Sequence, residues 1–139
     1  TLPEEEMLIR ADGRRMWRVI ENLYNNAAKY AMPGSRIYVD GMCAAGKVTV
    51  IIKNISESPL NFDAEELMER FVRGDVSRNT EGSGLGLEIA RNLTIMMNGK
   101  FDIYLDGDLF KVILTFNLAH KEQEPENKEQ GQTMSDDEK

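Results

Sequence analysis

Two asparagines and a lysine stand at the spacing of a helical stripe. Asn22, Asn26 and Lys29 lie at i, i+4 and i+7 within residues 16–31, MWRVIENLYNNAAKYA. At 100° per residue, this spacing puts the three side chains along one edge of the helix's apolar stripe. Asparagine carbonyl oxygens can hold a Mg²⁺ ion that is already bound to phosphates, without adding negative charge, and the lysine can meet the phosphates. We therefore expect a magnesium and nucleotide-phosphate site, although asparagines that bond to neighbouring backbone give the same pattern.

A glycine cluster forms the second candidate site. Gly82, Gly84 and Gly86 alternate directly before a predicted helix. Free backbone N–H groups and the positive end of the helix dipole attract phosphate there, and glycine lets a ligand approach the chain closely. A flexible lead-in to the helix would show the same pattern. The cluster lacks the GK[ST] of a P-loop, and no strand runs directly into a G-x-G-x-x-G motif.

Apolar spacing predicts the elements that must position these residues. Asp12 is placed to cap the helix at 16–31, whose core-facing stripe comprises Met16, Ile20, Leu23, Ala27 and Ala31. The other patterns predict, in order, a short strand at 7–9, hairpin strands at 36–42 and 47–53, a loop at 54–61, a short helix from 63 to about 71, a polar loop up to 83, a helix at 87–97, and hairpin strands at 101–105 and 109–118.

This order of elements predicts an α+β fold. We expect a two-layer α/β sandwich, a mixed sheet with the two long helices on one of its faces. Residues 1–119 should form the domain, with a mobile lid at about 72–84. Residues 120–139 hold seven acidic residues and three lysines with no apolar spacing, which predicts a disordered acidic tail.

Composition narrows the class of protein. The net charge of −7 argues against nucleic acid and against an anionic membrane as partners. The single cysteine, Cys43, excludes an intrachain disulfide and favours a reducing, cytoplasmic setting. No run of eighteen apolar residues is present, so we expect no membrane contact by this chain. The start at Thr1 suggests a domain cut from a longer parent.

Three motifs in a fixed order carry a family resemblance. NLYNNAAKY (22–30), RFVRGDVSR (70–78) and GSGLGL (82–87) resemble the N box, F box and second glycine box of the catalytic ATP-binding domain of bacterial sensor histidine kinases. That domain belongs to the gyrase, chaperone, kinase and MutL (GHKL) superfamily, which has the Bergerat fold. The resemblance covers roughly residues 7–118.

The resemblance implies a role for each matching residue. Asn26 would be the magnesium ligand, Asn22 and Lys29 would lie near the phosphates, and Tyr30 would lie against the adenine. In the lid, Phe71 would be an aromatic anchor, and Arg73 together with Arg78 would reach the γ-phosphate. The lid hinge and phosphate cradle would comprise Gly82, Ser83, Gly84, Leu85, Gly86 and Leu87.

Asn22 separates the reactions within this superfamily. The resemblance implies that the ATP-hydrolysing members of the superfamily have a glutamate at this position, which activates water. An asparagine amide cannot act as a general base in this way. Glu21 is adjacent but points about 100° away around the helix. The resemblance therefore implies transfer of the γ-phosphate to another protein's nucleophile rather than hydrolysis.

The first glycine box departs from the family pattern. Asn54 stands where the family usually has an aspartate that accepts from the adenine amino group, and Ser56 and Ser58 stand at glycine positions. Asn54 can still accept through its carbonyl oxygen, but without a charge-assisted bond. The alternative reading is a nucleotide-independent pseudo-kinase that acts as an interaction module.

The resemblance as a whole implies a domain that works with other segments. It would bind ATP and Mg²⁺ and present the γ-phosphate to a histidine in a separate dimerisation domain of the same parent, for relay to a response regulator receiver domain. His120 is the chain's only histidine and has no dimerisation motif around it, so the isolated domain should not autophosphorylate. The parent would be anchored in the cell membrane. An ATP-hydrolysing relative or an anti-sigma-type serine kinase is less favoured.

Overall fold

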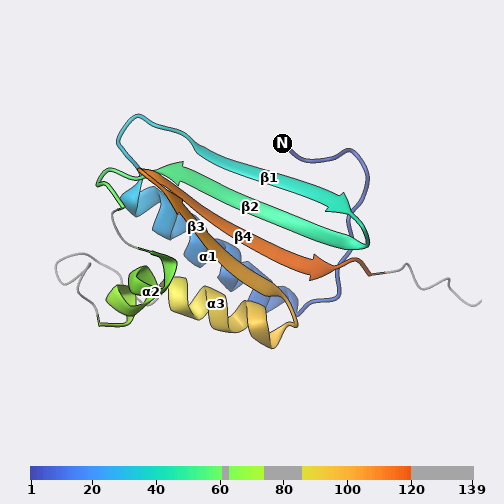
Figure 1. Ribbon diagram of the computed structural model, residues 1–139. Helices are drawn as coiled ribbons and strands as arrows, with labels where there is room; N and C mark the ends of the chain where they lie inside the picture. Colours follow the sequence, from blue (N-terminus) through green and yellow to red (C-terminus); the bar gives the residue numbers. More distant parts are fainter. Residues whose placement is uncertain (61–62, 74–85, 120–139) are drawn as a thin grey trace, which may run out of the picture.

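The chain folds into two layers, a sheet and a set of helices on one of its faces (Figure 1). The computed structural model describes residues 1–60, 63–73 and 86–119. Within them the elements are α1 (Gly13–Tyr30), β1 (Ile37–Ala44), β2 (Lys47–Ile55), α2 (Ala64–Arg73), α3 (Gly86–Met96), β3 (Lys100–Asp106) and β4 (Leu109–Asn117). The predicted α+β two-layer class is confirmed.

The sheet joins two hairpins through their second strands. Its order is β1-β2-β4-β3, and all three pairings are antiparallel. The mixed sheet that we expected is therefore wrong for the described residues. The predicted strand at 7–9 is also wrong, because Ile9 forms only an isolated bridge with Leu118.

Short turns set the register of each hairpin. Ala45 and Gly46, between β1 and β2, have φ angles of 53° and 73°, and Gly107, between β3 and β4, has a φ of 61°. Positive φ at these places gives a tight turn whose twist matches that of the paired strands. The predicted hairpins are thus confirmed, and β2 runs two residues beyond its predicted end at 53.

Alternation along the strands turns one face of the sheet towards the helices. On β4, the even-numbered side chains are buried, and the odd-numbered ones from 109 to 115 are half-buried. The buried core includes Val48 and Ile52 of β2 together with Phe110, Val112, Leu114 and Phe116 of β4. α1 packs mainly against α3, and both cover this face (Figure 1).

The buried face of α1 is turned slightly from the predicted stripe. Leu23 and Ala27 are buried as predicted, but Val19, which the stripe left out, has no exposed surface. Val19 lies about 20° around the helix from Asn26, so burial reaches the edge that carries the asparagines. The predicted cap is confirmed, since Asp12 Oδ1 accepts from the backbone N–H groups of Arg14 (3.0 Å) and Arg15 (3.2 Å).

Gly99 marks a close approach between α3 and β4. α3 ends at Met96, Asn98 takes a φ of 61°, and the Gly99 N–H donates to the Thr94 carbonyl at 2.9 Å. A Cβ added at Gly99 would lie 2.5 Å from Cε1 of Phe116, which is buried. Glycine is therefore required here by space rather than by its backbone angles.

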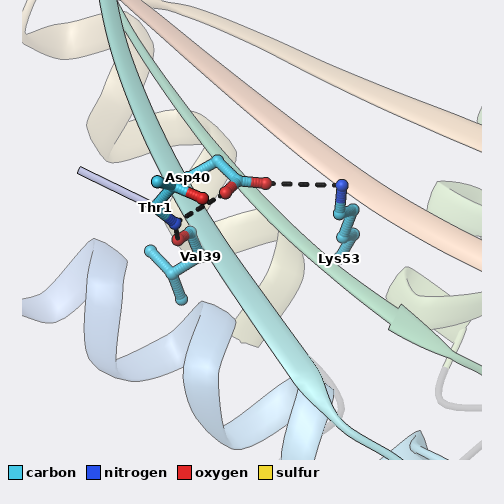
Figure 2. Close-up of polar contacts among 4 residues, drawn as sticks. All are labelled: Thr1, Val39, Asp40 and Lys53. Atoms are coloured by element: carbon cyan, nitrogen blue, oxygen red, sulfur yellow. Dashed lines mark hydrogen bonds and ion pairs between the residues drawn. The ribbon is translucent and has the colours of Figure 1, made fainter. Parts of the chain in front are cut away.

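An ion-pair group fastens the first residue to β1. Figure 2 shows the Asp40 carboxylate between two cations: its Oδ1 is 2.7 Å from the Thr1 ammonium, and its Oδ2 is 3.3 Å from Lys53 Nζ. The Thr1 ammonium also donates to the Val39 carbonyl at 2.8 Å. The hydrogen bond from the ammonium, followed by that from Lys53, lowers the pKa of Asp40 from 3.8 to about 2.

We predict that Gly99→Ala destabilises the fold by about 1–3 kcal/mol, because the added methyl overpacks a filled part of the core. Gly13→Ala is the matched control, since nothing lies within 4 Å of a Cβ at this first residue of α1. Urea denaturation followed by circular dichroism measures both. Equal unfolding free energies for the two variants would contradict the close approach to Phe116.

Asp40 predicts a dependence of stability on pH. Because its folded pKa is depressed, the ionised carboxylate stabilises the fold above about pH 4, and this stabilisation is lost as the pH falls towards about 2. Asp40→Asn should lower the urea midpoint of unfolding near neutral pH. The difference in midpoint from the unsubstituted chain should shrink as the pH falls through that window.

Asp102→Asn serves as the control for this pH series. Asp102 Oδ2 is 3.5 Å from Lys100 Nζ, and the Asp102 side chain is 45% exposed. If the urea midpoints of Asp40→Asn and the unsubstituted chain differ by the same amount at every pH, the ion pairs of Asp40 do not stabilise the fold.

Candidate functional site

The C-terminal end of α1 is hydrogen-bonded to the end of β2. The Met32 N–H donates to the Ile55 carbonyl at 2.8 Å, and the Glu57 N–H donates to the Tyr30 carbonyl at 2.9 Å. Ala31 and Ser56 form the bridge between these two bonds. The asparagine-bearing half of α1 and the last residues of β2 are therefore held together at one edge of the core.

The start of α3 meets this half of α1. A Cβ built at Gly86 would lie 3.3 Å from Oδ1 of Asn22, so the glycine backbone lies directly against the asparagine side chain. The Nδ2 atom of Asn22 is buried and has no hydrogen-bond partner among the described residues. The structure thus brings together one residue from each of the two sites that the sequence predicted separately.

The rest of the predicted α1 stripe lies at the core margin. Asn26 and Lys29 are both half-buried, as is Tyr30, which packs against the core. Lys29 Nζ lies 5.2 Å from the centroid of the Tyr30 ring. The stripe therefore offers two amides, an ammonium group and an aromatic ring at one edge of the helix.

Asn54 supplies a second buried amide. We expected it in a loop, but it lies in β2, where it pairs with Ile37 of β1 and Phe110 of β4. The residue is 2% exposed, and its Oδ1 has no hydrogen-bond partner in the described part of the chain. The alternation that buries Val48 and Ile52 continues to this position, and this was the signal that sequence reasoning overlooked.

The two serines after Asn54 are arranged differently. Ser56 is 6% exposed, its N–H donates to the Asp108 carbonyl at 2.7 Å, and its Oγ accepts from the Ser58 N–H at 3.3 Å. Ser58 is exposed. The N–H and the Oγ of Ser56 thus have partners close in sequence or at the β3–β4 turn, whereas the Asn54 Oδ1 has no partner among the described residues.

Buried polar atoms without partners indicate a place for a ligand. Leaving one such atom unpaired costs about 1–3 kcal/mol, which a ligand's hydrogen bond recovers. The described residues hold no group of three or more histidine, cysteine, aspartate or glutamate side chains that could bind a metal by themselves. The donor set, neutral amides beside Lys29, fits an anionic ligand that brings its own metal-coordinating oxygens.

Several predicted site residues are only partly described or lie outside the described residues. Leu87 is fully buried, so its side chain packs in the core. Arg73 is the last residue of α2, which continues two residues beyond its predicted end near Phe71 and into the predicted lid. The predictions for Arg78, Gly82, Ser83, Gly84, Leu85 and His120 concern residues outside the described ones.

A separate cavity lies at the other ends of the same helices. It has a volume of about 660 Å³ and lies between the start of α1, the end of α3 and the end of β4. Its lining includes Arg10, Arg15, Met96 and Phe116. None of the predicted site residues borders this cavity.

Comparison with known proteins gives a consistent result. The family described as histidine kinase-, DNA gyrase B- and HSP90-like ATPases matches residues 11–135. The probable sensor protein PcoS of Escherichia coli is 33% identical over 115 residues, covering 80% of this chain and 25% of PcoS. The sensor histidine kinase WalK of Bacillus subtilis is 28% identical over 131 residues, covering 91% of this chain and 21% of WalK.

A solved structure shows the same fold. The nucleotide-free catalytic domain of the histidine kinase ThkA matches with a TM-score of 0.68 and 25% identity, covering 84% of this chain and 75% of that one. This chain spans only about a quarter of the length of the curated relatives. In the part of it that the structure describes, no helix is both long enough and apolar enough to cross a membrane.

We predict that Gly86→Ala displaces the Asn22 side chain without unfolding the protein. A contact of 3.3 Å is tighter than usual, so the amide must shift by a few tenths of an ångström, whereas alanine suits the first residue of a helix. The side-chain amide resonances of Asn22 should move, with unfolding free energy within about 1 kcal/mol of the parent. Gly13→Ala is the control, and unchanged Asn22 resonances in Gly86→Ala would contradict the contact.

Proposed function

We propose that this chain, which belongs to the family of histidine kinase-, DNA gyrase B- and HSP90-like ATPases, is the part of a two-component sensor histidine kinase that binds Mg-ATP and presents its γ-phosphate for transfer. The observation that supports this most directly is the contact of Asn22 with Gly86. It joins the asparagine helix to the glycine-rich segment. The buried Asn54 Oδ1, which has no partner among the described residues, lies at the end of β2 that is bonded to α1.

Each side chain at this edge has a proposed role. Asn26 holds Mg²⁺ through its carbonyl oxygen, while Asn22 and Lys29 bind the phosphates. Tyr30 lies against the adenine, and Asn54 accepts a hydrogen bond from the adenine amino group. The metal, when bound, neutralises negative charge on the β- and γ-phosphates.

The glycine-rich segment and the lid complete the proposed site. The backbone of residues 82–87 cradles the phosphates at the start of α3, where the helix dipole favours negative charge. Arg73, at the end of α2, and Arg78 approach the γ-phosphate when the nucleotide is bound.

The chemistry at Asn22 favours transfer over hydrolysis. An amide cannot remove a proton from water, and Glu21 is exposed, about 100° away around α1. The γ-phosphate therefore passes to a nucleophile that this site does not supply. We propose that it is a histidine in the dimerisation domain of the parent, whose ring nitrogen bonds to the γ-phosphorus as the bond to the β,γ-bridging oxygen breaks and ADP leaves.

The proposal extends to the longer protein. The phosphohistidine is then the donor to the receiver domain of a response regulator, and the parent is anchored in the cell membrane with this domain on the cytoplasmic side. The isolated chain binds ATP without phosphorylating itself.

One observation favours a second function. Asn54 offers the base a neutral amide, so the site has no charge-assisted bond to adenine. A domain that has lost nucleotide binding and regulates a partner through the same fold would show this feature.

Calorimetric titration with the β,γ-imido analogue of ATP, with and without Mg²⁺, tests the two functions. We expect saturable binding that strengthens with Mg²⁺. Asn26→Ala should weaken the binding in the presence of Mg²⁺ by about tenfold or more, since a metal ligand is lost. The fold should remain, because Asn26 lies at the margin of the core.

Asn25→Ala is the matched control, because Asn25 is the exposed neighbour of Asn26 on the same helix. Its affinity should equal that of the parent. Equal nucleotide affinities of Asn26→Ala and the unsubstituted chain in Mg²⁺ would overturn the role of Asn26. No binding at millimolar nucleotide in a folded sample would overturn the kinase function and favour the regulatory module.

A further inference from the structure

We propose that Asn54 makes the base pocket permissive, so that the site binds 6-oxopurine nucleotides such as those of guanine and hypoxanthine as well as adenine nucleotides. This inference rests on the proposed function and names the substrate class of the same site. It concerns the one buried amide in this edge of β2 whose carbonyl oxygen has no partner among the described residues.

The residues around Asn54 do not fix the orientation of its side-chain amide. In the sheet it lies between Ile37 and Phe110, whose side chains carry neither donors nor acceptors. Ser56, two residues further along the chain, accepts a hydrogen bond from the Ser58 N–H through its Oγ. No hydrogen bond in the described part of the chain therefore fixes which end of the amide faces a ligand.

The base edges explain why this matters. Adenine presents a donor at its 6-amino group beside an acceptor at N1, whereas guanine and hypoxanthine present an acceptor at O6 beside a donor at N1. An asparagine side chain carries one acceptor and two donors, so it matches either edge after a 180° turn of its amide. A carboxylate in the same place can only accept hydrogen bonds, so it cannot donate one to O6.

The position of Asn54 makes it suited to reading a base. Its side chain is on the sheet face that packs against the helices, and the end of β2 is tied to Tyr30 at the end of α1. The proposed phosphate-binding residues Asn26 and Asn22 lie about one and two turns before Tyr30 along α1. A nucleotide with its phosphates at the asparagine stripe thus directs its base towards β2.

The test compares the parent chain with Asn54→Asp. Calorimetry with the β,γ-imido analogues of ATP, GTP and ITP in Mg²⁺ gives three dissociation constants for each protein. In the parent, the guanine and hypoxanthine analogues should bind within about tenfold of the adenine analogue. In Asn54→Asp, the ratio of the 6-oxopurine to the adenine dissociation constants should rise by about tenfold or more, the discrimination that one matched polar pair gives.

Two further variants protect the comparison. Asn117→Asp makes the same chemical change at an exposed residue at the far end of β4 and should leave the three constants unchanged. Asn54→Leu keeps the side-chain size without donors or acceptors, so it remains informative if the buried carboxylate unfolds the protein. It should weaken the adenine and 6-oxopurine analogues by similar factors.

The outcomes separate this inference from the function on which it rests. Binding of the adenine analogue with rejection of both 6-oxopurine analogues by the parent would overturn the permissive pocket and leave the kinase function standing. So would a loss in Asn54→Leu that is confined to the adenine analogue. Absence of binding by all three analogues would overturn the proposed function itself.

Discussion

The antiparallel pairing of β2 with β4 is the interaction on which the rest of the structure depends. It merges two locally formed hairpins into one sheet and aligns Val48 with Phe116 and Ile52 with Val112 on a single apolar face. α1 and α3 bury that face, and their mutual packing fixes where the start of α3 meets α1. Without this pairing each hairpin would expose its apolar side, and two-stranded sheets alone are at best marginally stable.

The candidate site lies where this packing gives way to polar side chains. Val19 and Leu23 of α1 are buried, and the next positions around the helix are the amides of Asn22 and Asn26. On β2, the same transition occurs between Ile52 and Asn54. Burial of amides without partners is unfavourable, so the core supplies the stability that these positions give up. A protein that uses such a margin for binding holds polar side chains in fixed positions, where a ligand can supply the hydrogen bonds that they lack.

The sequence predicted the elements that local patterns specify. The apolar period and Asp12 predicted α1, and the turn residues predicted both hairpins. Pairing between distant strands has no local signature, which is why the mixed sheet and the strand at 7–9 were wrong. Asn54 was expected in a loop that begins where the strand pattern of 47–53 ends, whereas pairing with β1 and β4 extends β2 through it. The contact of Asn22 with Gly86 depends on how α1 and α3 cross, and spacing along the chain does not reveal that.

Mapping of chemical shifts on addition of Mg²⁺ and the β,γ-imido analogue of ATP tests the central claim most directly. The account predicts that the largest changes are in the side-chain amides of Asn22, Asn26 and Asn54 and in the backbone amide of Gly86, with the asparagine changes on α1 requiring Mg²⁺. Changes centred instead on the cavity beside Arg10, Arg15 and Met96, with the asparagine amides unmoved, would contradict it.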